Sequence, residues 1–188
     1  PVKLNVLTVQ TVSATMGAAA IHASTMAAAI AIALIAIAMV VWYRMSGLIA
    51  DLALTIYLFL VLGALWGLHA TITVPGIAGL ILSVGMAVDA NVIIFSRIRE
   101  EMINGKKPGA AVAFGYRNAI RAIIDSHVTI FASSLILFFL GTGDVKGFAI
   151  ILMIGTAISL LTAVSVTGIV VRWVADAGWA RVRAVFVG

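Results

Sequence analysis

The stretch GMAVDANVIIF, Gly85–Phe95, places an aspartate and an asparagine inside an otherwise apolar run. The rest of the chain is similarly apolar: 63% of its 188 residues are hydrophobic, 10% are charged, and the mean hydropathy is +1.21. A soluble domain typically has about 45–50% apolar and about 25% charged residues. The composition therefore predicts a membrane protein in which Asp89 lies within a membrane-spanning helix.

Working outward from Asp89, five segments are long and apolar enough to cross about 30 Å of hydrocarbon as helices. We expect these spans at residues 24–43, 47–68, 75–95, 122–140 and 145–171. The sequence thus predicts an all-α fold with a transmembrane domain over residues 24–173. Residues 1–23, which begin abruptly with a polar, strand-like segment, are interpreted as the remnant of a missing periplasmic domain, and residues 174–188 as a cytoplasmic tail.

Lysine and arginine are distributed unevenly between alternate loops. Ten of the twelve fall on one side: Arg44, Arg97, Arg99, Lys106, Lys107, Arg117, Arg121, Arg172, Arg181 and Arg183. The other side receives only Lys3 and Lys146. By the positive-inside rule, the connection 97–121 and the C-terminus lie in the cytoplasm and the N-terminal segment lies outside. The net charge of +5 is then a feature of topology, and we expect no nucleic-acid partner.

The connection 97–121 contains a candidate helix of its own. Pro108 suits the first turn of a helix. Apolar side chains then recur at helical spacing, at Val112, Tyr116, Ala119, Ile120, Ile123 and Ile124. Because Arg117 and Arg121 lie off that face, we expect an amphipathic cytoplasmic helix on the membrane surface, leading into the fourth span. The alternative is a helix packed on the cytoplasmic end of the bundle.

Asp89 is the principal candidate for chemistry. An ionised carboxylate near the middle of a span costs at least about 2.5–3.5 kcal/mol on insertion scales, so such residues face the bundle interior or a water-filled cavity. There the carboxyl group can change its protonation state near neutral pH, as a proton carrier must. The alternative is a structural aspartate that forms hydrogen bonds with neighbouring helices.

Two further polar residues have simpler explanations. Asn91 projects from nearly the opposite side of the helix to Asp89, and it is as well suited to joining helices as to function. Asp51 lies about one turn from the cytoplasmic interface, where a helix dipole favours a carboxylate, so a structural role is the stronger interpretation.

Polar residues also form two stripes at helical spacing. Asp125, Thr129 and Ser133 share a face of the fourth span, and Ser159 and Thr162 share a face of the fifth. The stripes could line a hydrated path beside Asp89, or they could form ordinary interhelical hydrogen bonds. The spacing does not separate these two possibilities.

Several function classes find no support in the sequence. The chain has no cysteine, its three histidines lack metal-ligand spacing, and His127 stands alone at the membrane edge, so we expect no metal site. Neither a Ser-His-Asp arrangement nor a nucleotide-binding loop occurs, and we expect no enzyme and no cofactor other than a proton as coupling ion. Because no lysine or arginine lies in the middle of a span, a cationic partner for Asp89 must come from another chain.

Four motifs carry a resemblance to a known family. They are GMAVDANVIIFSRIREE at 85–101, SGLIADLAL at 46–54, PGIAG at 75–79 and ILFFLGTGDVKGFA at 136–149. Together they closely resemble the helix signatures of SecD proteins, protein-export subunits of the SecD/SecF family in the proton-driven RND superfamily. The resemblance is strong over about residues 46–163.

The resemblance implies a six-helix RND-type half-bundle, of which the chain carries five helices. It also implies that Asp89 matches the intramembrane aspartate required for proton-coupled export, with Asn91 in the same motif and Asp125 in the following helix. The chain departs from the family pattern at Ser96, where glutamate is usual, and at His127, where asparagine is usual. The family's first helix and large periplasmic domain are expected before residue 1.

The function implied is an auxiliary one in the Sec translocase: the proton-motive force would drive late steps of protein export across the bacterial cytoplasmic (inner) membrane. The implied partners are a SecF-like second half, the SecYEG channel, a YajC-like subunit, the translocating polypeptide and the lipid bilayer. Two alternatives stay open. One is another RND-superfamily exporter of lipids or small molecules, and the other is a scaffold for partner helices that transports nothing.

Overall fold

The computed structural model describes the backbone of residues 14–176 and the side chains of residues 17–173, and all regular elements in this part of the chain are helices joined by short turns. The elements are α1 (Ala14–Gly67), α2 (Val74–Ile103), α3 (Pro108–Leu140), α4 (Asp144–Thr162), the π-helical η1 (Ala163–Thr167) and α5 (Gly168–Asp176). Four helices in the described range are long and apolar enough to cross a membrane: α1, α2, α3, and the uninterrupted run of α4, η1 and α5. The expectation of an all-α bundle of helices that could cross a membrane is therefore confirmed for the described residues. The parts of the predicted N-terminal remnant and C-terminal tail at 1–13 and 177–188 lie outside the described residues.

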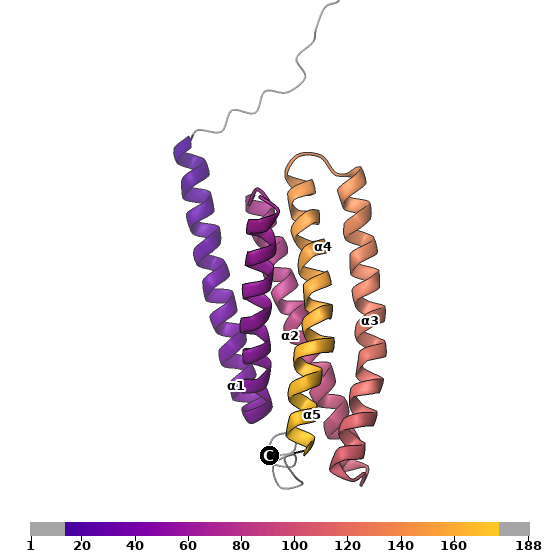
Figure 1. The fold of residues 1–188 in the computed structure, drawn as a ribbon. Helices are drawn as coiled ribbons and strands as arrows, with labels where there is room; N and C mark the ends of the chain where they lie inside the picture. Colours follow the sequence, from indigo (N-terminus) through magenta and orange to yellow (C-terminus); the bar gives the residue numbers. More distant parts are fainter. Residues whose placement is uncertain (1–13, 177–188) are drawn as a thin grey trace, which may run out of the picture.

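Helix α1 changes direction at Arg44. A straight helix of its 54 residues would be about 80 Å long, far more than a bilayer needs. Arg44 instead has a non-helical backbone conformation, with φ 48° and ψ −117°. The chain reverses there into a second arm (Figure 1). Gly47 permits the reversal, because a Cβ atom at that position would collide with the backbone of Met39.

Helices α2 and α4 form the centre of the bundle, since α2 contacts α1, α3 and α4, and α4 contacts α1 and α3 (Figure 1). A stripe of small residues on α2 makes this possible: Gly79, Ser83 and Ala87 are all buried. A Cβ at Gly79 would lie 3.1 Å from the Phe148 ring on α4. Small side chains at a spacing of four residues, which the sequence itself shows, therefore let the two helices approach closely.

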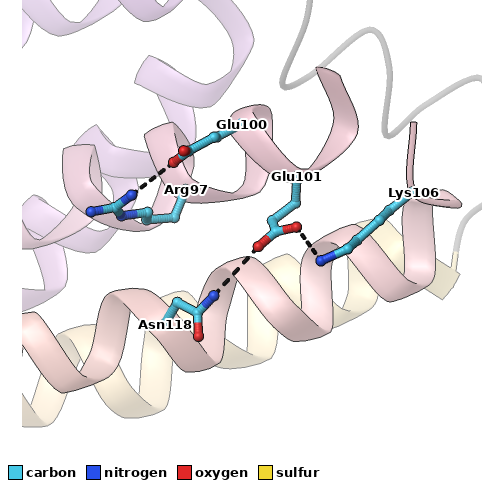
Figure 2. Close-up of polar contacts among 5 residues, drawn as sticks. All are labelled: Arg97, Glu100, Glu101, Lys106 and Asn118. Atoms are coloured by element: carbon cyan, nitrogen blue, oxygen red, sulfur yellow. Dashed lines mark hydrogen bonds and ion pairs between the residues drawn. The ribbon is translucent and has the colours of Figure 1, made fainter. Parts of the chain in front are cut away.

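The turn between α2 and α3 is fastened by side chains of both helices. Figure 2 shows Glu101 at the end of α2 between Lys106 in the turn and Asn118 on α3, whose amide lies 3.4 Å from the carboxylate. On the last turns of α2, Arg97 pairs with Glu100 at 2.8 Å. Two ion pairs, Arg97–Glu100 and Lys106–Glu101, thus lie at this end of the bundle.

The amphipathic cytoplasmic helix is not a separate element. Residues 108–121 form the first turns of α3, which continues without interruption to Leu140. The apolar face expected from the spacing is largely buried, with Val112, Ala119 and Ile123 inside the bundle. Gly115 lies against the backbone of Ile98 on α2, since a Cβ there would be 2.7 Å from the Ile98 Cα. Packing against α2 therefore supports the alternative of a helix on the end of the bundle.

The predicted fifth span, residues 145–171, also differs in detail. Its helix begins at Asp144, close to the expected residue, but it contains the π-helical segment η1. Nothing in the apolar pattern indicates this segment, because a π-helical turn has no distinctive composition. Such segments are rare and occur frequently at functional sites.

Candidate functional site

Asp89 lies on the outer surface of the described bundle. On α2 the exposed positions include Leu82, Asp89 and Ser96, which follow one another at intervals of seven residues, about two helical turns. The Asp89 carboxylate forms no hydrogen bond or ion pair with any described residue. Asp89 therefore does not face the interior of the described part of this chain, and a water-filled cavity or a partner chain beside it stays a prediction. The interior face of α2 is the one that carries the small-residue stripe, and Asp89 lies off it.

Asn91 lies on the buried side of the same helix. Only 3% of its surface is exposed, and its Oδ1 accepts a hydrogen bond of 2.6 Å from the Thr167 hydroxyl in η1. The two polar residues of the motif thus face in different directions, as the sequence spacing predicts. Asp89 is open to a partner, whereas Asn91 joins α2 to the π-helical segment of this chain.

Tyr116 on α3 is a second residue whose side chain forms a hydrogen bond with η1. The Tyr116 hydroxyl on α3 donates a hydrogen bond of 2.7 Å to the Val164 carbonyl. Burial raises the pKa of Tyr116, and the nearby Arg172 charge acts in the opposite direction. The hydroxyl therefore remains protonated and able to donate at neutral pH.

His127 is the residue that sequence reasoning missed. It is not at an exposed edge: only 4% of its surface is accessible, and it joins α3 to α4. Its Nδ1 lies 2.8 Å from the Ile123 carbonyl and its Nε2 lies 3.0 Å from the Ser159 hydroxyl. Because a carbonyl only accepts, we assign the proton of the neutral ring to Nδ1, and Nε2 accepts from Ser159.

The two predicted polar stripes lie on different sides of the bundle. Ser159 and Thr162 are buried, and the Thr162 hydroxyl donates to the Ser159 carbonyl at 2.9 Å. Asp125, Thr129 and Ser133 are exposed on the outer face of α3. The Thr129 and Ser133 hydroxyls donate to the carbonyls one turn earlier, each at 2.9 Å. The structure therefore brings the α4 stripe to His127 and leaves the α3 stripe on the surface.

Asp51 is placed near the start of the second arm of α1. It is partly buried, and its Oδ1 is enclosed without a hydrogen-bond partner among the described residues. No described contact joins it to Asp89. The structure therefore does not bring the predicted site residues into one cluster: among the described residues, Asn91 bonds to Thr167 and Ser159 bonds to His127. The sequence signal that could have identified His127 was its place between Asp125 and Thr129, four residues after Ile123 and therefore on the same helix face as that apolar residue.

Comparison with known proteins shows extensive similarity. Residues 2–177 match the family described as "Protein export membrane protein SecD/SecF, C-terminal". The chain is 51% identical over 167 residues to the protein translocase subunit SecD of Acidaminococcus fermentans, covering 89% of this chain and 40% of that protein. It is 45% identical over 172 residues to the SecD subunit of Sebaldella termitidis, covering 92% of this chain and 42% of that one.

A solved structure shares the fold. The crystal structure of SecDF, a translocon-associated membrane protein from Thermus thermophilus, matches with a TM-score of 0.83 and 39% sequence identity. The match covers 87% of this chain and 23% of the SecDF chain. The chain therefore spans about two fifths of the SecD subunits named above and a smaller share of SecDF.

Proposed function

Because this chain belongs to the SecD/SecF C-terminal family of protein export membrane proteins, we propose that it forms the membrane part of an auxiliary subunit of the Sec translocase. The subunit uses the proton-motive force to promote late steps of protein export, and it is not an enzyme. The observation that carries this proposal is the position of Asp89, an acidic side chain within an apolar helix, exposed on the bundle surface and without a partner among the described residues.

Asp89 acts in this proposal by gaining and losing a proton. While ionised, it attracts a cationic group on a partner; once protonated, it no longer does, and the helices shift relative to one another. The change of charge at Asp89 thus favours one of two arrangements of the helices over the other. Asn91 supports this role, because its hydrogen bond to Thr167 connects the helix that bears Asp89 to η1 within the chain.

The proposal includes partners and a topology. An exposed carboxylate at membrane depth is costly in lipid, which supports a SecF-like second half that covers α2 and supplies the cation. The subunit would then associate with the SecYEG channel, a YajC-like subunit and the translocating polypeptide. The reversal at Arg44 supports five spans, with α1 contributing two. Basic residues are concentrated at the end of the bundle that contains the α2–α3 turn. This supports an orientation in the bacterial inner membrane with that end facing the cytoplasm.

The test is protein export driven by a proton gradient, measured in membrane vesicles that carry the full-length subunit with its partners. Asp89→Asn keeps the shape and the hydrogen-bonding capacity of the side chain but cannot ionise, so we expect the gradient-dependent part of export to disappear. Asp144→Asn is the matched control, because it removes a carboxylate in the first turn of α4, at the end of the membrane-spanning region. It should export like the wild type.

Other outcomes would favour the alternatives. Normal export by an Asp89→Asn subunit that still assembles contradicts proton coupling at this residue and favours a scaffold. If export is unaffected by deleting the whole subunit, and the subunit does not co-purify with the translocase, then a different RND-type exporter is the better description.

A further inference from the structure

A cavity of about 720 Å³ lies between the first half of α3 and α5, at the basic end of the bundle. It is separate from Asp89, and the proposed export mechanism does not use it. Three arginines line it: Arg117 and Arg121, one turn apart on α3, and Arg172 on α5. Its volume falls within the range of about 300–1,000 Å³ that is typical of ligand sites.

The three guanidinium groups have no carboxylate partner within ion-pair distance among the described residues. Arg117 lies over the Phe114 ring at 5.0 Å and Arg172 lies at 6.0 Å from the Tyr116 ring. Their neighbours Arg97 and Lys106, by contrast, are paired with glutamates (Figure 2). Like charges around one cavity repel each other unless an anion lies between them, so this cavity is suited to an anion.

The rest of the cavity is apolar. Val112 and Ile120 on α3 and Val171 on α5 form much of its wall. A soluble phosphate would gain nothing from these side chains. A molecule with an anionic head and a hydrocarbon body would contact both kinds of surface.

The cavity also lies at the right depth for such a molecule. Arg121 directly precedes the apolar run 122–140, whose 19 residues span about 28 Å as a helix, close to the thickness of the hydrocarbon core. Arg172 directly follows the apolar run that ends at Val171. Both arginines therefore lie where the hydrocarbon ends and the lipid phosphates begin.

We propose that the cavity between α3 and α5 binds the phosphodiester headgroup of an anionic phospholipid, with Arg117, Arg121 and Arg172 around the phosphate and an acyl chain along Val112 and Val171. Basic pockets between membrane helices are known to hold such headgroups. The C-terminal segment 177–188 is a poor occupant in terms of charge, because it contains Arg181 and Arg183 and no acidic side chain.

A lipid in this position would also brace η1. Tyr116 lines the cavity and holds the Val164 carbonyl, and Gly168 allows its close approach, since a Cβ there would lie 2.6 Å from the Tyr116 hydroxyl. Occupancy of the cavity would therefore restrain the π-helical segment that contacts Asn91.

The test is native mass spectrometry of the purified full-length protein, titrated with cardiolipin, phosphatidylglycerol or phosphatidylcholine. We expect the wild type to retain the two anionic lipids preferentially. The double variant Arg121→Gln/Arg172→Gln should bind them at least about tenfold more weakly, since each basic group near an anionic headgroup contributes about fivefold. Arg99→Gln is the matched control, because it removes the same charge from an exposed position on α2 that does not line the cavity. It should bind like the wild type.

Two additions separate the sources of the anion and exclude misfolding. Arg121→Lys/Arg172→Lys keeps both charges and should recover most of the binding. Millimolar inorganic phosphate or glycerophosphoglycerol, which lack acyl chains, should not displace the lipid. Equal binding by the double variant and the wild type would overturn the proposal, as would equal retention of phosphatidylcholine. Displacement by phosphate alone, or by an acidic peptide, would replace the lipid with a soluble anion or a protein segment as the ligand.

Discussion

Gly155 on α4 faces Ser83 on α2 at a point where the two helices leave no room for a larger side chain. A Cβ atom at Gly155 would lie 2.5 Å from the Ser83 Oγ and 3.0 Å from the Tyr57 hydroxyl. That hydroxyl donates to Ser83 at 2.7 Å, so one hydrogen bond and one close contact join α1, α2 and α4. The absence of a side chain at a single position thus determines how closely the central helices pack.

Gly155→Ala should destabilise the bundle by about 1–3 kcal/mol, because overpacking forces Ser83 or the helix backbone to move. Thermal unfolding in detergent measures this effect. Gly63→Ala is the control: its Cβ would meet nothing within 4 Å, so it should be neutral or slightly stabilising through helix propensity. If both variants melt at the same temperature, the close approach at Gly155 is not a constraint.

At the scale of elements, η1 is the feature with the most distinctive connections. Its five residues interrupt the α-helical hydrogen bonding of the run from α4 to α5. Two side chains from other helices hold it, Tyr116 at the Val164 carbonyl and Asn91 at Thr167. These contacts place η1 between the cavity on one side and the helix that bears Asp89 on the other.

Tyr116→Phe should loosen η1 while it leaves the bundle folded. The variant removes the donor to the Val164 carbonyl, at an expected loss of about 1 kcal/mol. Hydrogen exchange measures the consequence, and we expect faster exchange confined to the amides of residues 163–172. Tyr43→Phe is the matched control, because no hydrogen bond of the Tyr43 hydroxyl occurs among the described contacts. Unchanged exchange in Tyr116→Phe would mean that η1 is held by packing alone.

At the scale of the whole molecule, one face of the bundle is unsuited to lipid. The exposed side of α2 carries Asp89, with Leu82 seven residues before it and Ser96 seven residues after it. The exposed side of α3 carries Asp125, Thr129 and Ser133 nearer its middle, but its last turn carries large apolar residues such as Phe139 and Leu140, which suit a hydrocarbon environment. The difference supports a protein partner on α2 and lipid on this part of α3.

Single cysteines test this distinction, because the chain contains none. In native membranes, Leu82→Cys should be crosslinked to a partner membrane protein by a short bifunctional reagent. Phe139→Cys, on an equally apolar and 72% exposed side chain, should yield no such product. Crosslinking from Phe139 alone would place the partner on α3 and contradict a partner on α2.

Much of the fold could be predicted because hydrophobic runs and small-residue spacing are local properties. The third and fourth spans appear within α2 and α3, the end at Leu140 is as expected, and the stripe on α2 is buried. The direction of Asn91 relative to Asp89 follows from helix geometry alone. The surface helix at 108–121 could not be predicted as part of α3, because an amphipathic pattern suits a lipid surface and a protein surface equally.

The sequence by itself determined that this chain forms apolar helices with an acidic residue inside one of them, because composition and hydrophobic periodicity are local properties of the sequence. Only the tertiary structure decided which faces of those helices meet. It buried His127 against Ser159, joined Asn91 to a π-helical segment, left Asp89 on the surface and gathered three arginines around one cavity. These pairings join residues far apart in the chain, and they depend on the packing of whole helices, which no local pattern specifies.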